Sequence, residues 1–179
     1  PEAELGLTFS ARNGGGDLVI DGEDKFTDLA VYVFNRQNGD LEFSELKTDF
    51  SPETSAASYV RSVRVTADKK SVYTLANYAG HTFTVAGQTA ALTENTPKSV
   101  LDASEISSSA FSADNLPMVG KKEVDMTGTA VTATLEMERL VGRVDLHIYK
   151  AAGLAGDMVE LVSVDFCNQV VRSNAQYQS

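Results

Sequence analysis

The sequence is poor in the residues from which most catalytic and metal-binding sites are built. It has one cysteine, two histidines and no tryptophan in 179 residues. The lone Cys167 excludes an intramolecular disulfide and a cysteine-based zinc site, and its strand-like surroundings predict a small buried side chain. The absence of tryptophan counts against a surface that stacks on sugar rings.

Positive charge and long apolar runs are also scarce. The formal net charge is −10, and nucleic acid is not an expected partner because binding to phosphates depends on lysine and arginine. No apolar run reaches the roughly 18 residues of a transmembrane helix. No signal peptide is visible. The chain begins at Pro1 rather than Met, so we expect that its N-terminus has been trimmed. The absence of a signal peptide therefore indicates nothing about export.

The polar residues that remain match no known catalytic or metal-binding motif. His147 lies two residues after Asp145, but the sequence has no serine in a nucleophile-elbow motif to complete a triad. Glu136 and Glu138 share a strand face and are most simply solvated. The acidic residues between 17 and 28 could offer oxygens to calcium, yet their spacing is not that of an EF-hand loop. We therefore expect no enzyme activity, no catalytic or metal-ligating residue and no cofactor.

β-Strand patterns dominate the rest of the sequence. Alternating or two-faced apolar runs occur at residues 5–9, 29–34, 41–43, 59–66, 71–77, 82–85, 129–149 and 159–166. About seven or eight short strands with little helix indicate an all-β, antiparallel β-sandwich. Asn38-Gly39 predicts a hairpin turn, and residues 116–120 a compact apolar turn.

Three finer features complete this prediction. Thr96 and Pro97 predict the N-cap and first residue of one short helical crossover. Residues 104–112 are rich in serine and predict a loop. Within 129–149 the apolar residues move from odd to even positions near Leu140, which indicates a bulge or a break between two strands.

The first strand is the most informative. Leu5, Leu7 and Phe9 alternate with small or polar residues, the pattern of a half-buried strand. Arg12 follows, and then three consecutive glycines, whose backbone is costly to order. Two interpretations stay open on this pattern alone. One is an ordinary edge strand followed by a loop, and the other is a detachable strand with Arg12 as an exposed protease site.

Five motifs, taken in order, resemble the Bacteroides-type fimbrillin family, the subunits of major and minor fimbriae. They are LGLTFSAR at 5–12, LAVYVF at 29–34, VYTLAN at 72–77, LPMVG at 116–120 and LVGRVDL at 140–146. The resemblance implies a transthyretin-like β-sandwich that is exported as an outer-membrane lipoprotein. It also implies that an arginine-specific protease cuts after the first strand and that a strand from another subunit fills the groove left behind.

The resemblance assigns roles to particular residues. By position Arg12 matches the cleavage arginine, and Leu5, Leu7 and Phe9 would fill the groove before cleavage. Residues 1–12 would then be a detachable first strand, and residues 13–179 the remainder of a single β-sandwich domain in its uncleaved form. Family members usually carry a second sandwich domain and a C-terminal donor strand, so the likeness is to the N-terminal domain, in a fragment or in a short relative.

The sequence thus predicts a structural subunit of a cell-surface fimbria that supports adhesion. Its expected partners are other fimbrial subunits, the arginine-specific protease and an unidentified host or bacterial receptor. The alternative is a cell-surface β-sandwich that binds glycan or protein without polymerising, with Tyr149 and Tyr177 as candidate contacts.

Overall fold

A computed structural model describes residues 2–11, 24–51, 55–107, 115–126, 128–140, 163 and 172–174. Within these residues the regular structure is almost entirely β. The strands are β1 (Glu2–Ala11), β2 (Leu29–Asn35), β3 (Leu41–Lys47), β4 (Ser58–Thr66), β5 (Lys69–Ala76), β6 (Thr82–Val85), β7 (Gln88–Thr89), β8 (Ser104–Ser107), β9 (Met118–Asp125), β10 (Ala130–Arg139) and β11 (Arg172–Asn174). The helix α1 (Lys98–Asp102) has five residues. No helix in this described part could cross a membrane.

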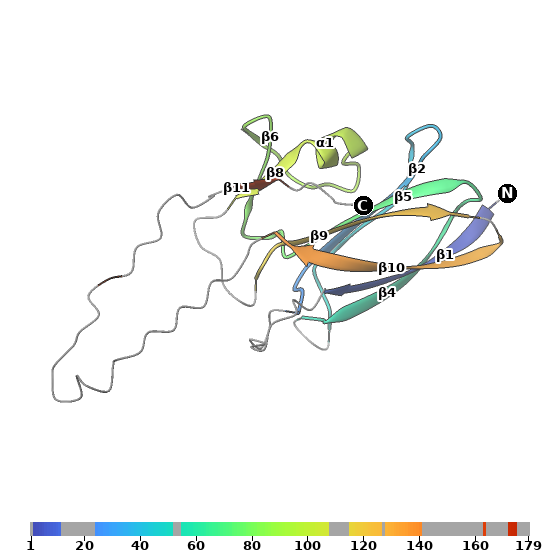
Figure 1. The fold of residues 1–179 in the computed structure, drawn as a ribbon, viewed down its shortest axis with the longest axis horizontal. Helices are drawn as coiled ribbons and strands as arrows, with labels where there is room; N and C mark the ends of the chain where they lie inside the picture. Colours follow the sequence, from blue (N-terminus) through green and yellow to red (C-terminus); the bar gives the residue numbers. More distant parts are fainter. Residues whose placement is uncertain are drawn as a thin grey trace, which may run out of the picture.

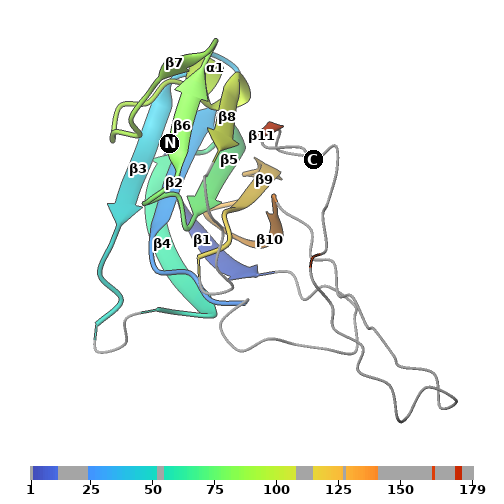
Figure 2. The ribbon, with the colours of Figure 1, turned by 90° about the vertical axis from the view of Figure 1, so that its left-hand side faces the viewer.

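A seven-stranded sheet forms the body of the molecule, with the strand order β3-β2-β5-β9-β10-β1-β4 (Figure 1). Its end strands β3 and β4 lie side by side, so the sheet nearly closes into a barrel (Figure 2). The prediction of an all-β protein is confirmed. The prediction of a purely antiparallel sandwich is wrong, because β1 runs parallel to β10 and one curled sheet makes the body.

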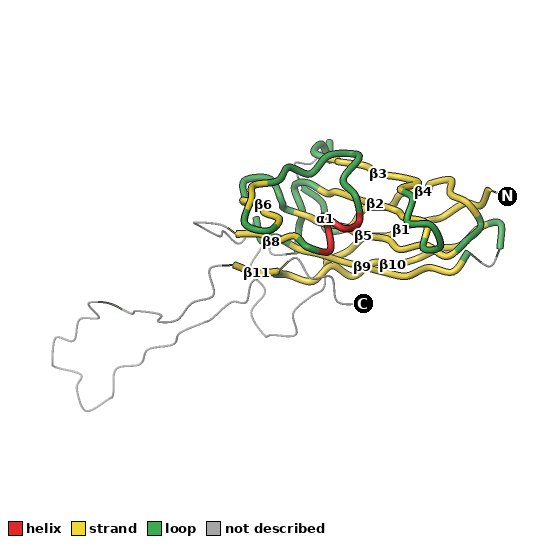
Figure 3. The backbone as a smooth tube through the Cα atoms, turned by 90° about the horizontal axis from the view of Figure 1, so that it is seen from above, coloured by secondary structure: helices red, strands yellow, loops and turns green. Residues whose placement is uncertain are grey.

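A small four-stranded sheet, in the order β11-β8-β6-β7, and the helix α1 accompany the large sheet (Figure 3). All seven residues of β2 are buried, which confirms the prediction of a two-faced central strand. Leu29, Val31 and Val33 face the interior of the large sheet. Tyr32 and Phe34 face outward and pack with residues of the small sheet and α1.

Several local predictions are confirmed, and others need correction. Gly39 has a φ of +80° in the β2–β3 turn, as the Asn-Gly pair predicts. The helix begins one residue later than expected, because Pro97 is its N-cap residue and the Thr96 hydroxyl instead donates to the Thr93 carbonyl oxygen at 2.9 Å. The strand β10 ends at Arg139, at the predicted break.

The sequence patterns missed four strands: β7, β8, β9 and β11. Residues 104–107 form β8 instead of a loop, because they pair with β6 and the side chain of Ile106 is buried. Residues 118–120 begin β9 instead of a turn, since the charged residues that follow hide any alternation. Apart from residue 163, the predicted strand at 159–166 lies outside the described residues, as do residues 141–149 and Cys167.

Candidate functional site

The first strand, β1, lies inside the large sheet between β10 and β4. It pairs in parallel with β10, from Glu4 opposite Ala130 to Ala11 opposite Met137. It pairs antiparallel with β4, from Glu2 opposite Thr66 to Ser10 opposite Ser58. Both rows of backbone donors and acceptors on β1 therefore face a neighbouring strand.

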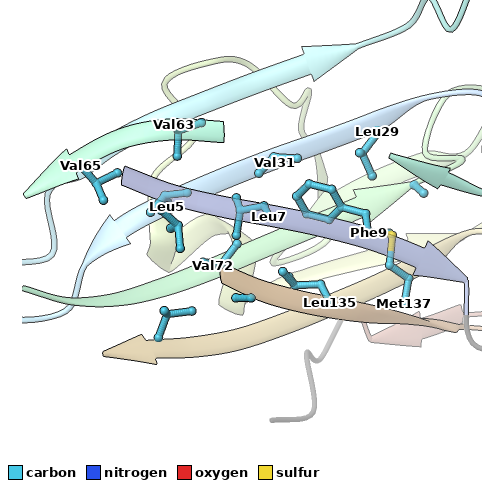
Figure 4. Close-up of a cluster of buried hydrophobic side chains, with 14 of the residues drawn as sticks. Leu5, Leu7, Phe9, Leu29, Val31, Val63, Val65, Val72, Leu135 and Met137 are labelled. Atoms are coloured by element: carbon cyan, nitrogen blue, oxygen red, sulfur yellow. The ribbon is translucent and has the colours of Figure 1, made fainter. Parts of the chain in front are cut away.

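The inward face of β1 fills the centre of the main core. Leu5, Leu7 and Phe9 are each 0% exposed, and Ala3 is 4% exposed. Figure 4 shows the side chains of β1 pointing between those of β4, β10, β2 and β5. The residues lining their position include Val63, Val65, Leu135, Met137, Leu29, Val31 and Val72.

This position is unusual because β1 is the first strand in the chain and yet an interior strand of the sheet. The interpretation of residues 5–9 as an ordinary edge strand is wrong, since strands pair on both sides of β1. Strands in a sheet lie about 4.8 Å apart, so β10 and β4 without β1 would flank a slot about 10 Å wide. A single cut between β1 and β2 would separate β1 covalently from every other described strand.

The outward face of β1 is polar and closely approached by its neighbours. Glu4 is exposed and accepts a hydrogen bond from the Ser62 hydroxyl on β4. At Gly6, a Cβ would come within 3.2 Å of the Thr132 Cγ2 atom on β10. The position of Gly6 therefore favours a small residue in any strand that lies there.

The side of β4 away from β1 meets β3 through side chains, and we call this boundary the β3–β4 seam. At one end, Glu42 on β3 accepts hydrogen bonds from the Thr66 backbone N–H and the Asn35 amide, both at 2.9 Å. The ammonium of Lys70, which is 0% exposed, lies 2.9 Å from Glu42 Oε1 and donates to Thr66 Oγ1 at 2.6 Å. The buried positive charge is therefore paired and hydrogen-bonded.

These contacts set the charge state of Glu42. Burial alone would raise the pKa of its carboxyl, but the hydrogen bonds from Thr66, Lys70 and Asn35 outweigh this and lower the pKa below 4.5. Glu42 thus stays ionised beside Lys70 over a wide pH range.

Further along the seam, Arg61 on β4 reaches two residues of β3. Its Nε atom lies 3.3 Å from Glu45 Oε2, and its guanidinium carbon lies 5.7 Å from the centroid of the Phe43 ring. The Tyr59 hydroxyl is 3.4 Å from either carboxylate oxygen of Glu45. No sequence prediction pointed to this seam. Glu45 and Lys47 lie two residues apart and so share one face of their strand, and this pair of charges is the signal that could have indicated it.

The other candidate residues do not add a second site. Arg12, His147, Tyr149 and Tyr177 lie outside the described residues. The Asp28 carboxylate, one of the possible calcium ligands, is buried and accepts hydrogen bonds from two backbone N–H groups of residues 78–79. Burial is the main reason why the pKa of Asp28 is raised. Among the described residues, no group of three or more His, Cys, Asp or Glu could hold a metal ion.

A shallow cleft lies between β9 and β10. The two strands pair only where Val119 and Met118 lie opposite Glu138 and Arg139, and Lys122 donates to the Thr134 carbonyl oxygen at 2.9 Å across the opening. The cleft of about 490 Å³ is lined by charges of both signs and by no aromatic ring. The lining therefore offers no aromatic face on which a sugar ring could stack.

The sequence matches one known family over most of its length. The profile of the family described as major fimbrial subunit protein (FimA) matches residues 3–160. No curated protein matches the chain in sequence.

Solved structures with a similar fold include a fimbrial assembly protein from Parabacteroides distasonis, with 16% identity and a TM-score of 0.51 over 78% of this chain and 54% of that one. A candidate cell adhesion protein from Bacteroides eggerthii has 23% identity and a TM-score of 0.52 over 78% of this chain and 40% of that one. The chain thus spans about half the length of these structures, or less.

Replacing Leu7 by alanine should strongly destabilise the protein. The side chain is fully buried in the main core, so we expect the free energy of unfolding to fall by about 2–5 kcal/mol. Thr8→Ala, on the outward face of the same strand, should change it by less than about 1 kcal/mol. Denaturant unfolding of the two variants measures the difference, and equal losses would contradict the described orientation of β1.

The Glu42 cluster should make the protein less stable in acid. Because the pKa of Glu42 is lowered in the folded state, its contribution is complete above the unfolded-state pKa, near 4.5, and is lost as the pH falls through the folded-state value. Glu42→Gln should cost about 2–4 kcal/mol at pH 7, since it leaves Lys70 without a counter-charge. That cost should shrink below about pH 4. Thermal melting of the parent and of Glu42→Gln at pH 7 and at acidic pH measures it, and a stability difference that does not change with pH would contradict this.

Proposed function

Because the chain belongs to the family of major fimbrial subunit proteins (FimA), we propose that it assembles into a cell-surface fimbria by exchanging β1 for a strand of a neighbouring subunit. Family membership makes it a structural subunit rather than an enzyme. Adhesion to a host or bacterial receptor, and export as an outer-membrane lipoprotein, belong to the same proposal.

The observation that carries the proposal is that β1 precedes every other described strand in the sequence and yet is an interior strand of the sheet. Most interior strands have other strands of the sheet both before and after them in the sequence, so a single cut cannot separate them from the rest of the sheet. A cut after Arg12 would leave β1 bound by its two ladders and its buried side chains alone. The chain could then lose β1 without a change in the order of the other strands.

A vacated slot is a strong site for β-strand addition. Its backbone groups on β10 and β4 would lack partners, and the pockets of Leu5, Leu7 and Phe9 would be empty. An incoming strand satisfies both if apolar residues occupy alternate positions. Because Thr132 approaches Gly6 closely, the incoming strand should also have a small residue between the two apolar residues that replace Leu5 and Leu7.

Digestion of the folded chain with an arginine-specific protease tests the first step. We expect the earliest cut after Arg12, identified by mass spectrometry, because Arg61 and Arg36 lie in or beside paired strands. Arg12→Lys keeps the positive charge and should block that cut. Earlier cleavage at other arginines would argue against a processing site at Arg12.

Capture of a peptide tests the second step. A fluorescent peptide with the sequence of residues 1–12 should enter the cleaved protein and raise its fluorescence anisotropy. The uncleaved protein should not take it up, and neither should a peptide with Leu7→Asp, because a buried unpaired charge is costly. If the cleaved protein takes up no peptide, the strand-exchange proposal fails.

A further inference from the structure

We propose that the β3–β4 seam holds β4 in place when β1 is absent, and so keeps the slot open for an incoming strand. This inference rests on the proposed function, in which β1 leaves. The residues concerned are those that bridge β3 and β4, chiefly Glu45, Arg61, Glu42 and Thr66.

The strand β4 depends on β1 for its backbone pairing. Among the described strands it pairs only with β1. Its beginning is anchored by a bridge between Ala56 and Phe26, and its end by the tight turn into β5, where Asp68 N–H donates to the Thr66 carbonyl oxygen at 2.9 Å. The nine residues between these anchors span about 30 Å and would have no ladder once β1 had gone.

Without another constraint, β4 could regain backbone hydrogen bonds by moving into the slot and pairing with β10. It runs antiparallel to β1, which is parallel to β10, so β4 and β10 could form an antiparallel ladder. To do so, β4 would cross about 5 Å, one strand spacing. Such a collapse would satisfy the backbone of both strands and leave no place for another strand.

The seam opposes this movement because its contacts are short. The ion pair between Arg61 and Glu45 spans 3.3 Å, and the hydrogen bond from Thr66 N–H to Glu42 spans 2.9 Å. A shift of about 5 Å would break both, and would take Arg61 away from the Phe43 ring. It would also leave the buried Lys70 with fewer partners, which is costly.

Tyr59 connects the seam to the slot itself. Its ring stacks on Phe9 of β1, with centroids 6.2 Å apart. On other sides it meets the edge of Phe50 at 5.8 Å and the Lys47 ammonium at 5.2 Å. Tyr59 therefore keeps partners outside the slot when Phe9 departs, so this end of β4 stays lined for an incoming aromatic side chain.

The test separates the seam from general stability. Arg61→Ala and Glu45→Gln weaken the seam, whereas the control Lys98→Ala breaks an exposed ion pair with Asp102 inside α1 and touches none of the seam contacts. A recognition sequence for a site-specific protease is placed directly after Arg12, and each full chain is cut with both pieces present. Binding of the fluorescent peptide of residues 1–12 is then measured, alongside the melting temperature of each uncut chain.

We expect the seam variants to bind the peptide about tenfold more weakly than the parent and Lys98→Ala to bind like the parent. The uncut chains should all melt within a few degrees of one another, because β4 is still paired with β1 and these contacts are partly exposed. Equal binding by all variants would overturn the role of the seam. So would a loss of stability in the uncut seam variants as large as the loss of binding, because the seam would then act on the whole fold.

Failure of this inference can be told apart from failure of the proposed function. If the cut parent chain binds no peptide, strand exchange itself fails and the role of the seam falls with it. If the parent binds and the seam variants bind equally well, only the role of the seam is wrong.

Discussion

The rest of this structure depends on the two ladders that β1 makes, with β10 on one side and β4 on the other. These ladders close the large sheet around the main core, and Leu5, Leu7 and Phe9 fill its centre. Since every other described strand follows β1 in the sequence, a single cut between β1 and β2 would separate it covalently from all of them.

If β1 leaves the sheet during assembly, as proposed, the other open boundaries of the sheet must resist unwanted pairing. The β3–β4 seam and the opening between β9 and β10 both carry charged side chains, and charge is a common defence of strand edges. At the β3–β4 seam the charges of Glu45 and Arg61 lie across from each other. Between β9 and β10, Lys122 occupies the opening and binds a β10 carbonyl oxygen. The position of β1 has no such charge on its inward face, which leaves it as the apolar place for a strand.

Much of the fold could be predicted from the sequence because the strong strands carry their own signal. The residues of β2 and β5 are apolar on both faces and are buried on both, and Gly39 supplies the φ of +80° that its turn needs. The predictions failed where a strand depends on its neighbour. In β8 (Ser104–Ser107), Ile106 is the single large apolar residue. In β9 (Met118–Asp125), charged residues follow the first three residues and interrupt any alternation. Neither strand therefore has a repeating apolar pattern of its own.

By itself the sequence determined which side chains of β1 turn inward, since alternation fixes the buried face of a strand. It also determined the family, through the order of its motifs. Only the tertiary structure decided that β1 is an interior strand, that it runs parallel to β10, and that Arg61 and Glu45 meet across the seam. The physical reason is that every strand offers the same backbone donors and acceptors, so alternation does not specify which strands become its neighbours or in which direction they run.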